Sequence, residues 1–233
     1  VKDYLNDKSS REDIVGFFEN IAKSSDNFLL QKDKLENEEY PLFKKDGNLT
    51  HIIYKEIRYH NILENLLAQD KDLKVIGLVR NPFAVIDSFL RSPREFRKDQ
   101  GWLEEEEWRY AMKKNLNKSE EFFGYEKWKE VYFNFKELEK EFSERFCMVY
   151  YEDLIKDTFN EVERIFNFCN LEVNRQTIKF LNDSKSSERR SVYSVFRDKL
   201  KDDEWKTSLN KLIFTEISND LKTNNMNQFL STK

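Results

Sequence analysis

A single arginine ends the most apolar stretch of the sequence. In KVIGLVRNPFAVIDSFLRS, residues 74–92, Arg80 is followed by Asn-Pro and then by a helical period that carries Ser88. A guanidinium offers a rigid fork of N–H donors that suits the oxygens of a phosphate. Ser88 adds a hydroxyl donor, and its side chain leans back toward the start of its helix. These residues indicate a site for an anion lying along the flank of the helix. The simpler alternative is a solvated arginine after a strand and a neutral serine on a helix.

Two other short apolar runs also end in charged or polar side chains. HIIYKE, residues 51–56, carries Lys55 and Glu56 at its end, and FCMVYYED, residues 146–153, carries Tyr151 before two acidic residues. In an open parallel sheet, ligands bind beyond the carboxyl ends of the strands. Three polar strand ends therefore predict a binding site at one edge of a sheet.

The surrounding elements fit such a sheet. Each of the three runs is short, rich in β-branched or aromatic residues and without polar alternation, as expected for parallel strands that are covered on both faces. Helical spacing of apolar residues fills 58–70, continues from Pro82 and returns in 158–171, with Thr158 as the candidate N-cap. Strands that alternate with helices predict an α/β fold with a parallel sheet flanked by helices.

The rest of the chain is predicted to be helical. Two long amphipathic helices are expected as an insertion over 102–145, and another helix over 205–221. We find no internal repeat and no linker, and therefore expect a single domain over 1–233. It would consist of a helical N-terminal part, 1–50, and a core, 51–222.

Composition limits the class of protein. The chain has 233 residues, of which 39% are hydrophobic and 36% charged, with a formal net charge of −4. This balance speaks against nucleic acid as a partner, and no apolar run approaches the roughly 18 residues of a membrane span. The two cysteines, Cys147 and Cys169, form no disulfide framework or metal motif. We therefore expect a soluble, cytoplasmic protein; the oligomeric state stays open.

Two of these segments resemble a known enzyme family. LVRNPFAVIDSF is similar to the 3′-phosphate-binding segment of sulfotransferases that use 3′-phosphoadenosine 5′-phosphosulfate (PAPS) as the donor. Arg80 and Ser88 match that pattern, and the resemblance implies that both hold the 3′-phosphate. VYYEDLIKDTFNEVERIFNFCNL, residues 149–171, resembles the family's strand end and following helix, which would place Tyr151 near the adenine.

Two weaker resemblances concern the reaction and the late part of the nucleotide site. YKEIRYH resembles the family's lysine-containing strand, in which Lys55 and Arg58 form Lys-x-x-Arg. The resemblance implies that Lys55 neutralises the leaving group, and Glu56 is the candidate base for the acceptor proton. SVYSVFRD followed by Trp-Lys resembles the family's late nucleotide loop, with Tyr193 and Arg197 as cofactor-binding residues.

The resemblance implies a P-loop nucleotide-kinase-like architecture and sulfuryl transfer from PAPS, without a metal, to a carbohydrate or small-molecule acceptor. The chain departs from the family in one respect. Its five glycines are isolated, so no Gly-rich loop for the 5′-phosphosulfate is visible, and we expect that loop to lie outside this numbered chain. Two alternatives remain: a noncatalytic binding or scaffold domain, and a P-loop-type phosphotransferase, although the glycine-rich loop of the latter is not visible either.

Overall fold

The Arg-Asn-Pro turn folds as the sequence predicts. In the computed structural model, β1 (Val75–Val79) is followed by α4 (Pro82–Arg91). Pro82 is the first residue of α4, a position where its missing N–H costs nothing. Asn81 is the N-cap, and its side-chain oxygen accepts the Phe83 N–H at 3.0 Å. Strand, turn and helix start thus follow from local sequence.

The chain divides into two compact units, and the division passes through both strands of the sheet. The structure describes residues 5–37, 41, 43–44, 47, 50–118, 122–186 and 202–230, without the side chains of 185 and 186. Unit 1 comprises Val1–Ile76, Glu144–Cys147 and Asp157–Leu200, and unit 2 comprises Gly77–Ser143, Met148–Lys156 and Lys201–Lys233. The single domain expected from the sequence stays a prediction.

The protein is mostly helical with a small parallel sheet, in which β1 pairs with β2 (Phe146–Tyr150). The prediction of a strand over 51–56 is wrong, because that segment forms no ladder and Ile53 is 87% exposed. Its Tyr54 ring instead contacts the Phe17 ring at 5.7 Å. A short apolar run shows only that a segment seeks apolar contact, and here a helix supplies it. The nucleotide-kinase-like architecture stays a prediction.

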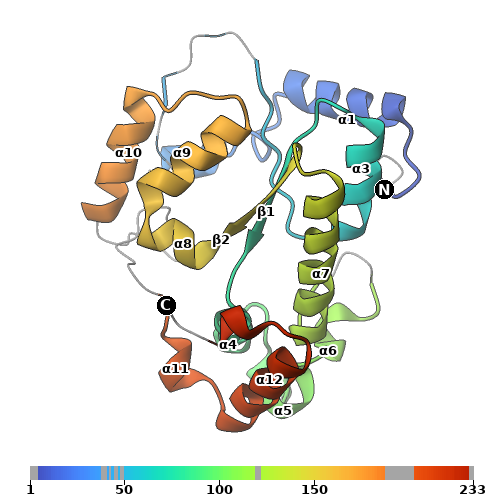
Figure 1. Cartoon of the computed structure of the whole chain (residues 1–233), viewed down its shortest axis with the longest axis vertical. Helices are drawn as coiled ribbons and strands as arrows, with labels where there is room; N and C mark the ends of the chain where they lie inside the picture. The colour runs from blue at the N-terminus through green and yellow to red at the C-terminus, as the bar shows by residue number, and fades with distance from the viewer. Residues whose placement is uncertain are drawn as a thin grey trace. The chain divides into compact units, whose positions relative to one another are not determined.

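Unit 1 holds six of the described helices: α1 (Arg11–Lys23), α2 (Lys32–Glu36), η1 (His60–Ile62), α3 (Leu63–Gln69), α9 (Thr158–Phe168) and α10 (Arg175–Ser186). α1 lies beside α3, as Figure 1 shows, and the two helices bury Ile14, Leu66 and Leu67. The predicted helices over 58–70 and 158–171 are confirmed. Thr158 is the first residue of α9 and not its cap, which is Asp157.

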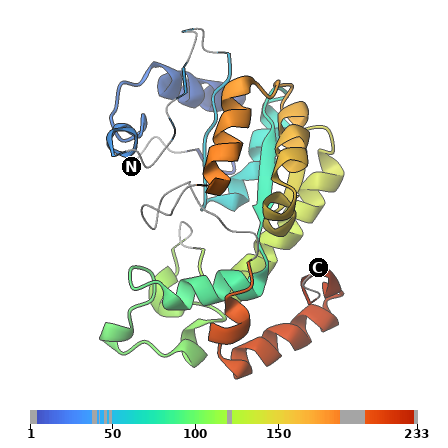
Figure 2. The same ribbon diagram turned by 90° about the vertical axis from the view of Figure 1, so that its left-hand side faces the viewer.

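Unit 2 holds α4 and eight further described helices: η2 (Lys98–Gln100), α5 (Glu104–Glu107), α6 (Met112–Asn115), α7 (Tyr125–Glu141), α8 (Tyr151–Lys156), α11 (Trp205–Ser208), α12 (Lys211–Thr223) and η3 (Asn227–Phe229). α4 contacts α7, α11 and α12, and Figure 2 shows it above the last two. The Phe83 ring stacks on Trp205 at 4.7 Å and on Phe214 at 4.9 Å. This aromatic stack joins the start of α4 to the C-terminal helices.

The predicted pair of long helices over 102–145 is wrong in its first half, where α5 and α6 are single turns. Ala111 and Leu116 flank α6 with positive φ angles of 47° and 49°, which end a helix. Gly124 precedes α7 with φ +93°, and a Cβ there would lie 2.7 Å from the Arg109 carbonyl oxygen. This close backbone approach requires glycine at position 124. A long helix, α7, begins at the next residue.

The helix predicted over 205–221 is likewise interrupted. Asn210 lies between α11 and α12, and its side chain accepts the Leu212 N–H at 2.8 Å as the N-cap of α12. The cap bond satisfies one donor of the new helix. Among all described residues, no helix combines the length and the apolar character needed to cross a membrane.

The two asparagine caps give a matched pair of variants. Asn81 is buried and also donates from its amide to the Phe229 carbonyl oxygen at 3.1 Å, whereas the Asn210 cap bond is exposed. Asn81→Ala therefore leaves two buried groups unpaired and should lower the free energy of unfolding by about 2–4 kcal/mol. Asn210→Ala should cost about 1 kcal/mol. Urea unfolding of both variants tests this, and equal losses would contradict it.

Candidate anion-binding site

Arg80 lies directly after β1, and its guanidinium is held by Asp202. Nε donates to Oδ2 at 2.5 Å and Nη2 donates to Oδ1 at 2.7 Å, so the pair is bidentate. The Arg80 side chain is 31% exposed and the Asp202 side chain 2% exposed. Burial disfavours the charged guanidinium, but the hydrogen bonds and charge of Asp202 outweigh it and raise the pKa of Arg80. The Arg80 guanidinium is therefore positively charged, and its paired N–H groups suit two oxygens. In this structure, the Asp202 carboxylate supplies those oxygens.

Two aromatic side chains hold Arg80 in place. Its Cζ atom lies 5.5 Å from the centroid of the Tyr151 ring, within the range of a cation–π contact. The Trp128 indole N–H donates to the Arg80 carbonyl oxygen at 3.0 Å. Tyr151 is the first residue of α8 and follows β2 directly. The structure thus brings together two predicted site residues, Arg80 and Tyr151.

A second carboxylate lies near the guanidinium. Glu152 accepts the Asn81 N–H at 2.7 Å through Oε1. Burial raises the pKa of Glu152 and the nearby charge of Asp202 raises it further, while the Asn81 N–H and Arg80 act against them. The end of β1 therefore carries one guanidinium and two carboxylates.

Asp202 is anchored through its backbone as well as its side chain. The Trp205 indole N–H donates to the Asp202 carbonyl oxygen at 2.8 Å, and Trp205 itself is buried in the stack with Phe83. We did not single out Asp202 from the sequence. The only signal is a run of three acidic residues, 202–204, directly before Trp205, and this pattern indicates no specific contact.

The other residues predicted for the site lie elsewhere in the described structure or outside the described residues. Ser88 is exposed on α4, and Lys55 is exposed in unit 1. Glu56, also in unit 1, accepts the backbone N–H groups of Ile57 and Arg58 at 2.7 Å and 2.8 Å, which gives it a local role in that turn. Tyr193 and Arg197 lie outside the described residues. The roles proposed for these side chains stay predictions.

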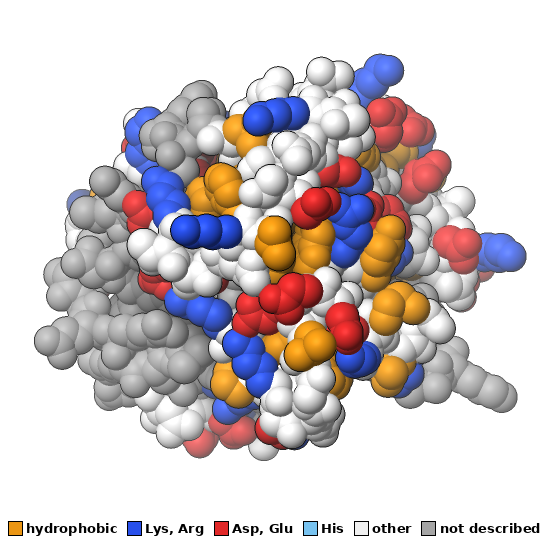
Figure 3. Space-filling model, turned by 90° about the horizontal axis from the view of Figure 1, so that it is seen from below, with side chains coloured by type: hydrophobic (Ala, Val, Ile, Leu, Met, Phe, Trp, Pro, Cys, Tyr) orange, Lys and Arg blue, Asp and Glu red, His pale blue; other side chains and the backbone are white. Residues whose placement is uncertain are grey.

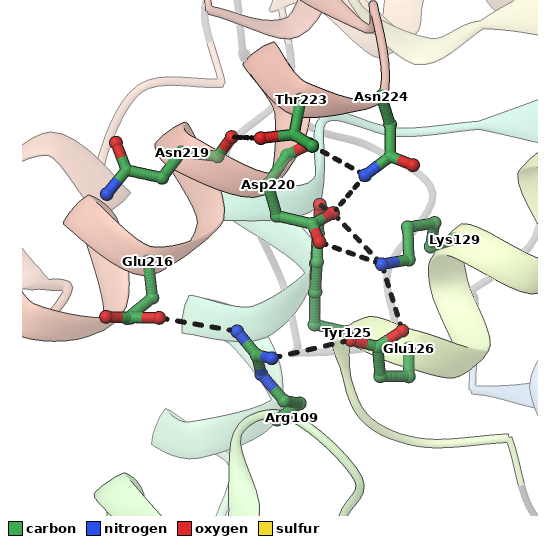
Figure 4. Close-up of polar contacts among 9 residues, drawn as sticks. All are labelled: Arg109, Tyr125, Glu126, Lys129, Glu216, Asn219, Asp220, Thr223 and Asn224. Atoms are coloured by element: carbon green, nitrogen blue, oxygen red, sulfur yellow. Dashed lines mark hydrogen bonds and ion pairs between the residues drawn. The ribbon is translucent and has the colours of Figure 1, made fainter.

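Another polar cluster of unit 2 is structural (Figure 4). Asp220 of α12 accepts from the Tyr125 hydroxyl at 2.7 Å and from Lys129 Nζ at 2.9 Å, and Lys129 also pairs with Glu126 at 3.0 Å. Burial raises the pKa of Tyr125, and its bond to Asp220 raises it further. Burial opposes the charge on Asp220, but these hydrogen bonds hold its pKa below the ordinary value. The cluster fastens α7 to α12.

Surface charge alone does not mark an anion site. On the face shown in Figure 3, acidic and basic side chains lie next to one another with apolar groups between them. The pair of Arg97 with Asp99, at 2.5 Å, is an example in which both side chains are largely exposed. Exposed pairs of this kind contribute little binding energy because water screens them. Arg80 differs from Arg97 because its guanidinium is more buried and lies at the end of a strand.

Comparison with known proteins identifies the class. Residues 6–175 match the family model described as the sulfotransferase family, so the chain belongs to that family. Among solved structures it is similar to the sulfotransferase domain from the curacin biosynthetic pathway, with 24% identity and a TM-score of 0.41 over 65% of this chain. The chain covers 53% of that domain, about half its length. No match was found among curated proteins.

The family match covers three of the four segments that resemble sulfotransferases. Residues 54–60, 80–88 and 149–171 lie inside it, whereas the segment from Ser191 to Trp205 lies beyond its last matched residue. Arg80 is therefore inside the matched region, and its partner Asp202 is outside it.

The raised pKa of Glu152 predicts a pH dependence of stability. A carboxyl group that binds its proton more tightly when folded contributes stability at low pH, and loses it as pH rises through the folded-state pKa. Glu152→Gln stays neutral and retains an oxygen for the Asn81 N–H. As pH rises above the ordinary pKa of a glutamate, about 4.3, the unfolding free energy of the wild type should fall relative to that of Glu152→Gln.

Urea unfolding at several pH values measures this difference. Asp153→Asn is the control, because Asp153 is the next residue in α8 and is exposed. An identical pH dependence for the wild type and Glu152→Gln would show that burial does not disfavour the Glu152 charge.

Proposed function

We propose that the chain binds PAPS and transfers its sulfuryl group to a hydroxyl or amine of a carbohydrate or small-molecule acceptor. Membership of the sulfotransferase family supports the reaction class. The observation that carries the proposal is the Arg80 fork at the end of β1, half-buried against the Tyr151 ring. The nature of the acceptor, the cytoplasmic setting and the nucleotide-kinase-like architecture stay predictions from the sequence.

The residues at the end of β1 fit a 3′-phosphate. Asp202 places two oxygens at 2.5 Å and 2.7 Å from guanidinium nitrogens of Arg80, which is the geometry that two phosphate oxygens would adopt. Tyr151 presents an aromatic ring beside the same guanidinium, and by family resemblance its ring would pack near the adenine. Exposed Ser88 would add one hydroxyl donor from α4.

Sulfuryl transfer makes two further demands on the chain. The acceptor oxygen or nitrogen attacks sulfur in line, the bond between sulfur and the phosphate oxygen breaks, and the acceptor proton passes to a base. By resemblance, Lys55 with Arg58 would neutralise the charge on the departing phosphate, and Glu56 would accept the proton. When bound, PAPS supplies the activated sulfuryl group.

Binding of the reaction product tests the nucleotide site directly. We expect calorimetry on the wild type to show that 3′-phosphoadenosine 5′-phosphate (PAP) binds in preference to 5′-AMP and ATP. Arg80→Ala should weaken PAP binding by about 100-fold, because two charge-assisted hydrogen bonds are worth about 3 kcal/mol or more. Ser88→Ala should weaken it by about 10-fold, because Ser88 would give the phosphate a single hydrogen bond.

Matched variants separate binding from folding. Arg97→Ala removes an exposed arginine of the same unit that pairs only locally with Asp99, and it should leave PAP affinity unchanged. Arg80→Lys retains the charge near Asp202 but lacks the fork, so it should fold and still bind PAP weakly. PAP binding that is measurable in the wild type and unchanged in both Arg80 variants would refute the proposed site.

A further inference from the structure

The Asp202 carboxylate engages the same guanidinium edge that a 3′-phosphate would use. Its two oxygens bind Nε and Nη2 of Arg80, and its side chain is 2% exposed. We infer that Asp202 is an internal competitor for Arg80, which a 3′-phosphate must displace, and that it thereby sets the affinity and selectivity of the nucleotide site. This inference rests on the proposed function.

The charges around Arg80 favour exchange over joint binding. Glu152 lies close enough to Asp202 for the Asp202 charge to affect its ionisation, so the guanidinium already faces two carboxyl groups. A phosphate monoester adds about −1.5 to −2 charges at neutral pH. A phosphate and the Asp202 carboxylate on one half-buried guanidinium would repel each other strongly, because partial burial weakens screening. Release of Asp202 into water removes one of them.

The exchange needs little movement of the backbone. The Trp205 indole holds the Asp202 carbonyl oxygen, and the Trp128 indole holds the Arg80 carbonyl oxygen. Both backbones are therefore pinned independently of the ion pair. Rotation of the Asp202 side chain away from Arg80 would free the guanidinium, and Tyr151 would continue to support it from the ring side.

The energetic consequence is a reduced apparent affinity. A ligand that binds only the state with a free guanidinium has its affinity lowered by the fraction of molecules in that state. A phosphate overcomes this because its larger charge forms stronger hydrogen bonds with the fork. A ligand that carries a single weak negative charge, or that has no 3′-phosphate, would not displace Asp202 from the guanidinium.

The test compares PAP with 5′-AMP on the full chain by calorimetry. Asp202→Asn is isosteric, retains the backbone bond to Trp205 and removes the competing charge. PAP should bind this variant about 10-fold more tightly than the wild type, or better, while 5′-AMP affinity stays the same. Asp203→Asn is the matched control, because Asp203 is adjacent and pairs with Lys206 at 3.9 Å; it should leave PAP affinity near the wild-type value.

A second variant and a second measurement distinguish a change in PAP affinity from a loss of folding. Asp202→Ser is smaller and neutral, and should also bind PAP more tightly. For both variants, PAP should raise the melting temperature by more than it raises that of the wild type. A variant that melts lower but gains this larger ligand-induced shift still supports the inference.

The remaining outcomes separate a failure of this inference from a failure of the proposed function. If the wild type shows Arg80-dependent PAP binding and Asp202→Asn binds equally or more weakly, Asp202 positions Arg80 and the inference is overturned, while the proposed function stands. If neither the wild type nor the Asp202 variants show Arg80-dependent PAP binding, both are overturned. PAP binding that appears only after Asp202 is neutralised would support both.

Discussion

Asn81 connects three elements of unit 2 through hydrogen bonds. Its N–H is accepted by Glu152 of α8, its side-chain oxygen caps α4, and its amide donates to the Phe229 carbonyl oxygen of η3. Each bond satisfies a group in a buried or partly buried environment, and an unpaired buried group costs about 1–3 kcal/mol. The position of Arg80, one residue earlier, depends on this junction. The backbone that presents the guanidinium is fixed before any ligand arrives.

The electrostatics at this junction are unusual for an anion site. A phosphate site commonly combines several donors, whereas here one guanidinium faces two carboxyl groups, Asp202 and Glu152. The closer carboxylate satisfies the arginine and lets it be half-buried in a stable fold. The same carboxylate is an obstacle to any anionic ligand. One ion pair therefore links the stability of the fold to the affinity of the proposed site.

Local sequence predicted the elements that are set by local forces. β1, α4 and α9 follow from apolar periodicity, a proline at the first helical position and a polar cap, all of which act within a few residues. The strand over 51–56 failed because an apolar run does not specify whether a strand or a helix will cover it. The first helix of the 102–145 insertion failed because left-handed residues such as Ala111 are not recognisable from their side chains.

The sequence by itself determined that an arginine follows a short apolar strand, that a capped helix begins two residues later, and that the chain resembles sulfotransferases, which family membership bears out. The expected burial of that strand on both faces is wrong, because Ile76 is 41% and Leu78 55% exposed. Only the tertiary structure decided what the arginine contacts. Asp202 is 122 residues away from Arg80, and Glu152 is 71 residues away from Asn81. Periodicity and capping act between near neighbours along the chain, whereas an ion pair requires only closeness in space. No local pattern could have identified the carboxylate that holds the fork.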